Sequence, residues 1–363
     1  MSYRYSKSVG TGQHILTRKT PSAMFLVMTI ADDAVDAVRE SISGLADLVT
    51  AVSSRAPEAT LSAIIAVGSD AWDRLYSGPK PASLHPFIAL TGEVHAAPAT
   101  SGDLLLHIKS DRMDLAFEVG RLWAASAGDA VNVVDEVHGF RYFDLRDLIG
   151  FVDGTENPTG DDAVDAIVVG DEDPDFAGGT YVAVQRYVTD FAAWTALSVP
   201  AQEAAIGRTK LENVEFDDDV KPSNSHIALN VVEDEEGNEL DIVRDNMPYG
   251  DVGGDGESGT LFIAYSRTPD VTEQMLRNMF IGDPEGNYDR LLDFTTAVTG
   301  NQYFAPTMEF LEDPPPAPVA EEEQLAVEDQ QPTAEPDPSD GSLGIGSLRA
   351  ATTRPKNVEG NIR

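Results

Sequence analysis

The sequence predicts an α+β fold made of two ferredoxin-like βαββαβ halves, in which helices pack on one face of an antiparallel sheet. Three observations lead to this prediction. Apolar runs of strand length are separated by stretches in which apolar residues recur at helical spacing. In residues 23–137 these elements follow the order strand, helix, strand, strand, helix, strand. A similar series begins near residue 180, which indicates two related halves, although no residue-level repeat is evident.

The first half is expected to contain four strands and two amphipathic helices. The nearly continuous apolar run 23–30 is typical of a buried strand, and further strands are expected at 61–67, 104–108 and 131–137. The first helix carries an apolar stripe made of Val35, Val38, Ile42 and Leu45. The second helix carries Leu115, Val119 and Leu122. Asp32 or Asp33 is expected to cap the first helix, and Asp111 the second.

The second half is expected to repeat this arrangement. Strands are expected at 180–188, 227–232 and 260–266, with a short extended segment near 303–306. The strand 260–266 is apolar on both faces, so it should lie in the middle of its sheet. Helices are expected over 190–205 and along the apolar stripe from Val271 to Phe280.

Composition limits the chemistry that the chain can carry. The 363 residues include no cysteine, which excludes disulfides, thiolate haem ligation, Cys-ligated iron–sulfur clusters and Cys-based zinc sites. A metal must therefore be held by carboxylates or by the six histidines. The formal charge of −37 disfavours nucleic acid and anionic membranes as partners. Because no apolar window reaches the roughly 18–20 residues of a membrane span, we expect a soluble, cytoplasmic protein.

The stretch 150–158, with the sequence GFVDGTENP, is the first candidate for a functional loop. Gly150 and Gly154 flank Asp153 and allow positive φ on both sides of it. The Asn-Pro pair that follows favours a turn or an extended path. A carboxylate on a rigid loop suits acid–base chemistry, because its position is fixed. The alternative is an ordinary surface Asp-Gly turn.

Two further polar features lie in the second half. His226 opens the strand expected at 227–232, where a lone histidine is usually an ordinary core or edge residue. In the stretch RDNMPYG, Arg244 and Asn246 would lie on one side of an extended chain, since strand side chains alternate with period two. That side would present a cation beside an amide. The alternative is an ordinary charged strand or loop.

The composition changes beyond the second half. Residues 313–340 are rich in Pro, Glu, Ala and Gln, so they cannot bury enough surface to offset the entropy of ordering, and we expect a disordered linker. In the last segment, 341–363, three aliphatic residues stand among small ones in Ser342–Leu348. This pattern suggests either a docking peptide or a tail without function. The expected divisions of the chain are therefore 1–149, 150–312, 313–340 and 341–363.

The loop GFVDGTENP, His226 and the RDNMPYG stretch together resemble the dye-decolourising peroxidases, nearest to their bacterial B-type subgroup. The resemblance covers about residues 4–312 and implies the fold of the dimeric α+β barrel superfamily, with haem b bound mainly in the second half. Ser342–Leu348, SLGIGSL, is similar to the cargo-loading peptides that direct such peroxidases into encapsulin shells. The run 350–363 beyond this peptide departs from that pattern.

The resemblance also implies roles for residues on the proximal side and at the haem edge. His226 would be the proximal iron ligand, and a carboxylate on its other ring nitrogen would make the imidazole more basic. Asp289 and Asp293 are both candidates for that carboxylate. Arg208 would pair with a haem propionate, because a guanidinium binds a carboxylate through two donors.

On the distal face the resemblance places Asp153, Arg244 and Asn246. Asp153 would carry a proton between the two peroxide oxygens, and Arg244 would stabilise the charge that develops as the O–O bond breaks. The residues do not decide which of the two dominates. Bulky donors would have to be oxidised at the surface, and the aromatic candidates for this, each of which is alternatively a core residue, are Tyr181, Tyr187 and Trp194.

The resemblance therefore predicts a haem peroxidase that reduces hydrogen peroxide, oxidises dyes, phenols or other one-electron donors, and is packaged inside an encapsulin nanocompartment. A homo-oligomer, either a dimer or a hexamer, is expected. The alternatives are a non-catalytic haem carrier and a shell-associated structural protein. Asp153 and Arg244 favour the enzyme, since carriage of haem requires neither. The physiological reductant and any use of manganese do not follow from the sequence.

Overall fold

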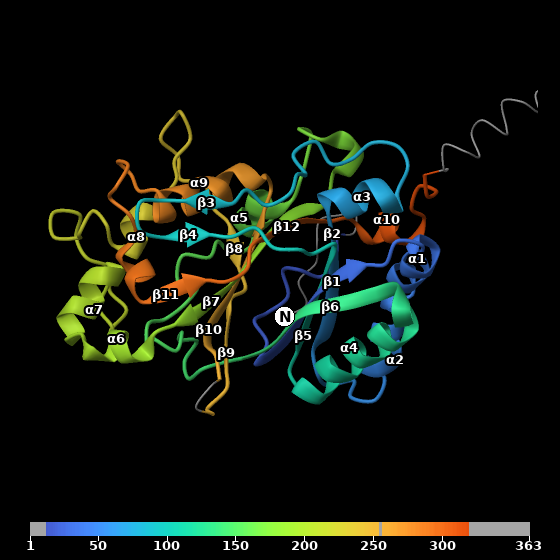
Figure 1. The fold of residues 1–363 in the computed structure, drawn as a ribbon, viewed down its shortest axis with the longest axis horizontal. Coiled ribbons are helices and arrows are strands. Elements are labelled where there is room, and N and C mark those ends of the chain that lie inside the picture. Colours follow the sequence, from blue (N-terminus) through green and yellow to red (C-terminus); the bar gives the residue numbers. More distant parts are fainter. Residues whose placement is uncertain (1–11, 254–255, 319–363) are drawn as a thin grey trace, which may run out of the picture. The chain divides into compact units, whose positions relative to one another are not determined.

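The computed structural model describes residues 12–253 and 256–318 and shows a mixed α+β architecture (Figure 1). The elements of the first half are β1 (Ser22–Ile30), α1 (Val35–Ser43), α2 (Leu45–Ser53), β2 (Leu61–Gly68), α3 (Ser69–Leu75), β3 (Leu90–Thr91), β4 (Ala96–Ala97), β5 (Leu104–Ser110), α4 (Met113–Ala127) and β6 (Val131–Phe140). Those of the second half are α5 (Asp161–Ile167), β7 (Thr180–Thr189), α6 (Phe191–Ala196), α7 (Val199–Ile206), α8 (His226–Leu229), β8 (Val243–Arg244), β9 (Met247–Gly250), β10 (Ser258–Ser266), α9 (Pro269–Phe280), β11 (Thr295–Ala297), β12 (Asn301–Ala305) and α10 (Met308–Glu312). No helix in the described ranges is both long enough and apolar enough to cross a membrane.

Both halves have the strand order of a ferredoxin-like fold. The first half has the order β6-β1-β5-β2, so its fourth strand lies beside its first and its third lies between its first and second. The second half repeats this arrangement as β12-β7-β10-β8, with β9 continuing β8 along β10. Strands β2 and β12 pair with each other and join the halves into one ten-stranded antiparallel sheet. The predicted fold class is confirmed.

Helices pack on one face of the main strands in each half. Helices α2 and α4 pack on the first-half strands, and α9 packs on β7 and β10. Along β1, Met24 and Leu26 belong to the core beneath the helices, whereas Phe25 belongs to a second core. That second core also contains Val182 and Ile263 from the second half. The faces turned away from the helices therefore pack against each other, as the period of two along each strand requires.

One predicted strand is wrong. Residues 227–232 do not form a strand, because His226–Leu229 is the short helix α8, which begins after the cap residue Ser225. The Ser225 hydroxyl accepts a hydrogen bond from the backbone of Ala228, which favours a helical turn at this point. The second strand of this half is instead β8–β9, the segment that carries Arg244.

Three details of the predicted helices are also corrected. The helix expected over 190–205 is two helices, α6 and α7, because Pro200 fits the first turn of a helix but not its interior. Neither Asp32 nor Asp33 caps α1, whose cap residue is Ala34. Asp111 does not cap α4. Its carboxylate pairs with Arg18 and accepts a hydrogen bond from the Thr60 backbone instead.

Candidate active site

His226 is held by a buried carboxylate. Its Nδ1 lies 2.7 Å from Oδ2 of Asp289, whose side chain is fully buried, while the imidazole is 26% exposed. The other Asp289 oxygen accepts a hydrogen bond of 2.8 Å from the Leu291 backbone, which fixes the carboxylate. Within the described ranges, Nε2 of His226 makes no hydrogen bond. The imidazole is therefore oriented at one nitrogen and free at the other.

The structure distinguishes the two candidate carboxylates. Asp293 has no contact with His226, since it binds Nε2 of His95 at 3.2 Å, the hydroxyl of Tyr288 at 3.1 Å and Nε of Arg290 at 2.9 Å. Asp289 is the carboxylate beside the imidazole.

The GFVDGTENP loop adopts the conformation that its glycines predict. Gly150 has φ of 96° and Gly154 has φ of 81°, both in the left-handed region that favours glycine. Between them, Asp153 donates its backbone N–H to the Leu145 carbonyl at 2.8 Å. Its Oδ1 lies 3.5 Å from the Nδ2 donor of Asn246, so two of the predicted distal residues meet.

Asn157 connects this loop to Arg244. Its Nδ2 donates to the Arg244 carbonyl at 2.6 Å, and its Oδ1 accepts from the Arg244 backbone N–H at 3.0 Å. This two-point contact fixes the backbone at Arg244 while leaving its guanidinium without an ion pair among the residues described. Asn157 stands inside the GFVDGTENP motif, where its position before proline predicts a turn but not this contact with Arg244.

One face of the second-half sheet brings these groups together. Arg244 pairs with Ala264 on β10, so both side chains point to the face that α9 covers, as does Thr260 four residues earlier. The Thr260 hydroxyl donates to the carboxylate of Asp147, which precedes the GFVDGTENP loop. Tyr187 pairs with Thr260 in the ladder and shares this face.

Electrostatics supports this juxtaposition. Burial raises the pKa of Asp147, and the charges of both Asp153 and His226 act on the same carboxyl group. Burial likewise raises the pKa of Tyr187, with a further contribution from Asp289. The Asp153 loop, Arg244 and the His226–Asp289 pair therefore gather on one side of the second-half sheet.

A small cavity opens beside the distal residues. Its volume is about 20 Å³, which is enough for roughly one water molecule. Asp153 and Asn246 form part of its wall, and three basic residues, Lys19, Arg141 and Arg146, form another part. In a chain with a formal charge of −37, this is a local concentration of positive charge.

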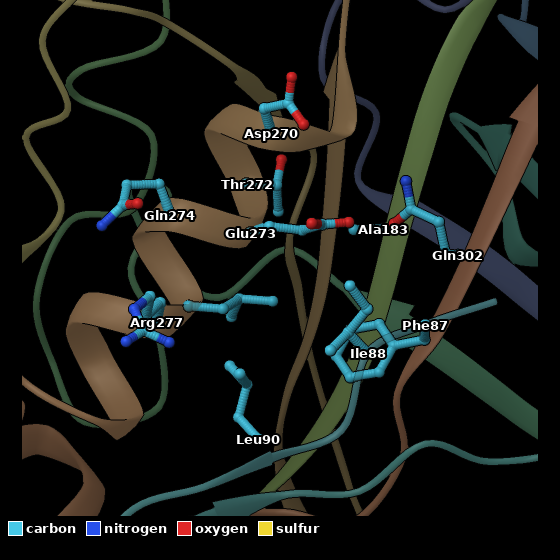
Figure 2. A pocket seen from close by; sticks show the side chains of 11 residues that line it. Phe87, Ile88, Leu90, Ala183, Asp270, Thr272, Glu273, Gln274, Arg277 and Gln302 are labelled. Atoms are coloured by element: carbon cyan, nitrogen blue, oxygen red, sulfur yellow. The ribbon is translucent and has the colours of Figure 1, made fainter. Parts of the chain in front are cut away.

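A larger cavity of about 300 Å³ lies against α9 (Figure 2). None of the predicted site residues lines it. Its wall is made of Phe87, Ile88, Leu90, Ala183, Asp270, Thr272, Glu273, Gln274, Leu276, Arg277 and Gln302.

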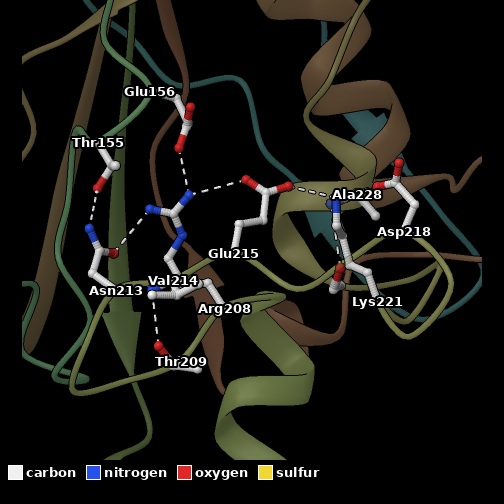
Figure 3. Close-up of polar contacts among 11 residues, drawn as sticks. Thr155, Glu156, Arg208, Thr209, Asn213, Val214, Glu215, Asp218, Lys221 and Ala228 are labelled. Carbon is white, nitrogen blue, oxygen red and sulfur yellow. Dashed lines mark hydrogen bonds and ion pairs between the residues drawn. The ribbon is translucent and has the colours of Figure 1, made fainter.

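Arg208 lies in a cluster of acidic side chains (Figure 3). Its guanidinium donates to Glu156 at 2.5 Å, to Glu215 at 3.2 Å and to Asn213 at 3.0 Å, and its side chain is only 6% exposed. Its Nε is buried and has no hydrogen-bond partner within the described ranges. Arg208 is therefore placed among carboxylates, and its binding to a propionate stays a prediction.

The aromatic candidates for surface oxidation are core residues. Tyr181, Tyr187 and Trp194 are all buried. The Trp194 indole donates to the Ile149 carbonyl at 3.0 Å, and the Tyr187 hydroxyl donates to Gln185 at 2.8 Å. The structure therefore supports the alternative prediction, that each of the three is a core residue.

The chain is similar to several known proteins. A dye-decolorizing peroxidase of Mycobacterium tuberculosis is 56% identical over 339 residues, which is 93% of this chain and 97% of that protein. The encapsulated DyP-type peroxidase of Mycobacterium smegmatis, solved by cryo-EM, is 58% identical with a TM-score of 0.84, covering 85% of this chain and all of that one. A DypB variant from Rhodococcus jostii RHA1, solved in complex with haem, is 54% identical with a TM-score of 0.81, covering 83% of this chain and 97% of that one.

Two models of one protein family match this chain. The profile of the Dyp-type peroxidase N-terminal region matches residues 12–141, and that of the C-terminal region matches residues 144–310. Together they span both halves of the fold. The chain belongs to the Dyp-type peroxidase family.

Proposed function

We propose that this protein uses haem b to reduce hydrogen peroxide and to oxidise dyes, phenols or other one-electron donors. The single observation that carries this proposal is the His226–Asp289 pair, which lies on the same side of the sheet as Asp153 and Arg244. The predicted peroxidase activity agrees with membership of the family, and the predicted haem agrees with the haem found in the similar Rhodococcus jostii variant.

The residues present fit a haem iron. Without cysteine, a histidine is the natural axial ligand for this chain. His226 offers a free Nε2, and the buried Asp289 at Nδ1 fixes the tautomer that leaves Nε2 with its lone pair. At the edge of the site, the unpartnered Nε of Arg208 is a donor suited to a propionate oxygen. We propose that His226 binds the iron and that Arg208 binds a propionate.

Bound haem would supply the two electrons that reduce hydrogen peroxide, and would recover them one at a time from the donor. The chain would supply the proton movement and the charge stabilisation. The Asp153 carboxylate would take a proton from one oxygen of hydrogen peroxide and give it to the other, directly or through a water. Asn246 holds Asp153 in place through its amide. Arg244 stabilises the negative charge on the departing oxygen, because a fixed cation with little solvent around it acts more strongly than water.

Steady-state turnover tests the proposed function. The haem-loaded protein is expected to consume hydrogen peroxide in proportion to the oxidation of an added dye. A non-catalytic haem carrier, which was the alternative, would show the haem spectrum without turnover. Free haem at the same concentration serves as the control. Turnover no faster than this control would overturn the proposal.

We also propose that the protein is encapsulin cargo and resides in a shell in the cytoplasm. The similar Mycobacterium smegmatis peroxidase was solved as an encapsulated protein. The segment proposed to bind the shell, Ser342–Leu348, lies outside the described residues. Deleting residues 341–363 is expected to leave peroxidase activity unchanged and to abolish co-purification with a shell protein. Undiminished co-purification would remove the segment from this role.

The assembly proposed for the free enzyme is a homo-oligomer, either a dimer or a hexamer built from dimers. Light scattering on the haem-loaded protein distinguishes these assemblies from a monomer.

A further inference from the structure

The core between the two half-sheets contains a buried ion pair. Nζ of Lys109, on β5, lies 2.5 Å from Oδ2 of Asp245, and the two side chains are 3% and 7% exposed. Beside this pair, Nδ1 of His107 lies 2.7 Å from the hydroxyl of Tyr265. Lys109 and His107 come from the first half, whereas Asp245 and Tyr265 come from the second.

Only the Lys109–Asp245 pair in this group is charged. Burial lowers the pKa of His107 to about 3, so its imidazole is neutral at physiological pH. Burial alone would raise the pKa of Asp245, but its neighbours, Lys109 first among them, together hold the pKa below its usual value. Nζ of Lys109 also donates to the Ile15 carbonyl at 3.1 Å, which fixes the ammonium group from a second side.

Asp245 stands between the two distal residues of β8–β9. Because side chains alternate along an extended chain, Asp245 points into the core between the half-sheets, whereas Arg244 points to the opposite face. Two adjacent residues of the extended chain therefore point to opposite faces: Arg244 to the predicted distal side and Asp245 to the buried ion pair.

The regular ladder is interrupted at this point. Strand β8 ends at Arg244 and β9 begins at Met247, so residues 245–246 lie outside both strands. The backbone N–H of Asp245 still donates to Ile263, at 3.1 Å. The N–H of Ile263, however, donates to the side-chain oxygen of Asn246 at 3.0 Å, not to a backbone carbonyl. The strand alone therefore gives this segment less support than an unbroken ladder would.

We infer that the Lys109–Asp245 ion pair is a positioning device that, together with the Asn157 contact at Arg244, fixes the backbone of residues 244–246 and thereby places Arg244 and Asn246 for the peroxide reaction. This inference rests on the proposed function. Stability does not account for the pair, because removing two charges from water costs about as much as their attraction returns, and apolar replacements are often neutral or stabilising. The location of the ion pair indicates a positioning role instead, because the pair connects the interrupted strand β8–β9 to strand β5 of the first half.

The test separates positioning from stability. In the double variant Lys109→Met, Asp245→Val the charges are replaced by apolar groups, so the chain is expected to unfold at a urea concentration close to that of the wild type. The rate constant for reaction of the haem-loaded enzyme with peroxide is expected to fall at least about tenfold in stopped-flow. The rate of the donor-dependent step should stay unchanged. Hydrogen exchange of residues 243–248 should become at least about tenfold faster.

Two further variants complete the design. The double variant Lys109→Gln, Asp245→Asn keeps the approximate shape of both side chains and removes both charges, so it replaces the first double variant if that one does not purify with haem. Asp135→Asn is the matched control, because Nε of Arg186 lies 3.1 Å from Asp135 and this pair also joins the halves. The control is expected to react with peroxide at the wild-type rate.

Wild-type peroxide rates and wild-type exchange in residues 243–248 of the charge-free variants would overturn the inference. An equal loss of rate in the Asp135→Asn control would also overturn it, because any contact between the halves would then have the same effect. If the wild-type protein does not react with peroxide, the proposed function fails. The exchange measurement still decides whether the ion pair holds the segment.

Discussion

The two halves share a strand order but differ at their second strand. In the first half, β2 pairs with β5 without interruption from Leu61 to Val67. In the second half, the corresponding strand is split into β8 and β9, with Asp245 and Asn246 between them. The candidate distal residues are located at this interruption. The repeated topology therefore provides the scaffold, and the departure from regular pairing provides the candidate site.

The same contrast separates the two histidines that have buried partners. His107, in the first half, is fully buried, stacks on Phe25 with ring centroids 4.3 Å apart and bonds a neutral tyrosine hydroxyl. His226, in the second half, is partly exposed and bonds a buried carboxylate. A carboxylate partner makes an imidazole a better donor to a metal, whereas enclosure in an apolar core leaves no access for one.

The largest effect is expected from replacing His226, the histidine with the carboxylate partner. The variant His226→Ala should purify without a haem Soret band, because the proposed iron ligand is gone. The matched variant His107→Gln should keep the band at wild-type intensity. Absorption spectra of the two purified proteins check both expectations. Full haem content and normal activity in His226→Ala would refute the ligand assignment.

A smaller effect is expected from the carboxylate behind the imidazole. Asp289→Asn should lower haem affinity or peroxidase activity about 10- to 100-fold, because it removes the negative charge that orients His226 and increases its basicity. Asp293→Asn is the control, since Asp293 contacts His95 and Arg290 and not His226. Haem titration and steady-state rates measure the two variants. Equal losses in both would contradict a specific role for Asp289.

The next effect is expected from Arg244, on the interrupted second strand of the second half. Arg244→Leu should slow the reaction with peroxide at least about tenfold, which corresponds to about 1.4 kcal/mol of barrier. Haem binding should be retained, because Arg244 is placed on the distal side. Stopped-flow absorbance after mixing with peroxide measures this rate. A wild-type rate would remove Arg244 from the mechanism.

The last effect, from His107, concerns the free energy of unfolding and not the rate of reaction with peroxide. A histidine whose pKa is lowered to about 3 on folding binds its proton more tightly in the unfolded chain. The free energy of unfolding is therefore unaffected by His107 above about pH 6.5 and falls as pH decreases from there towards 3. Between pH 7 and 5 this loss amounts to about 2 kcal/mol.

Urea unfolding of wild type and His107→Gln at the two pH values isolates this contribution. The variant should lose less stability than the wild type as pH falls. Parallel pH dependence in the two proteins would show that His107 is not buried in its neutral form.

The sequence predicts the fold and the distal loop well, because both depend on local signals. Alternating apolar runs define the strands, and the glycines around Asp153 report a backbone conformation that few other residues adopt. The spacing of Arg244 and Asn246 also reflects a local property of an extended chain, and the structure brings Asn246 to Asp153.

Other features depend on contacts between distant residues, so the sequence could not specify them. Asp289 and Asp293 lie four residues apart, and only the fold decides which one reaches His226. Helix α8 spans four residues, which is too short for a periodic pattern to reveal. Lys109 and Asp245 belong to different halves, and each alone looks like an ordinary charged residue in a strand.

The central claim is that His226 and the Asp153–Arg244 group form one haem peroxidase site. The most direct test is the absorption spectrum of the full-length, haem-loaded protein before and after one equivalent of hydrogen peroxide. We expect a Soret band that shifts on mixing with peroxide and returns when an electron donor is added. A protein that takes up no haem, or whose Soret band does not respond to peroxide, would contradict the claim.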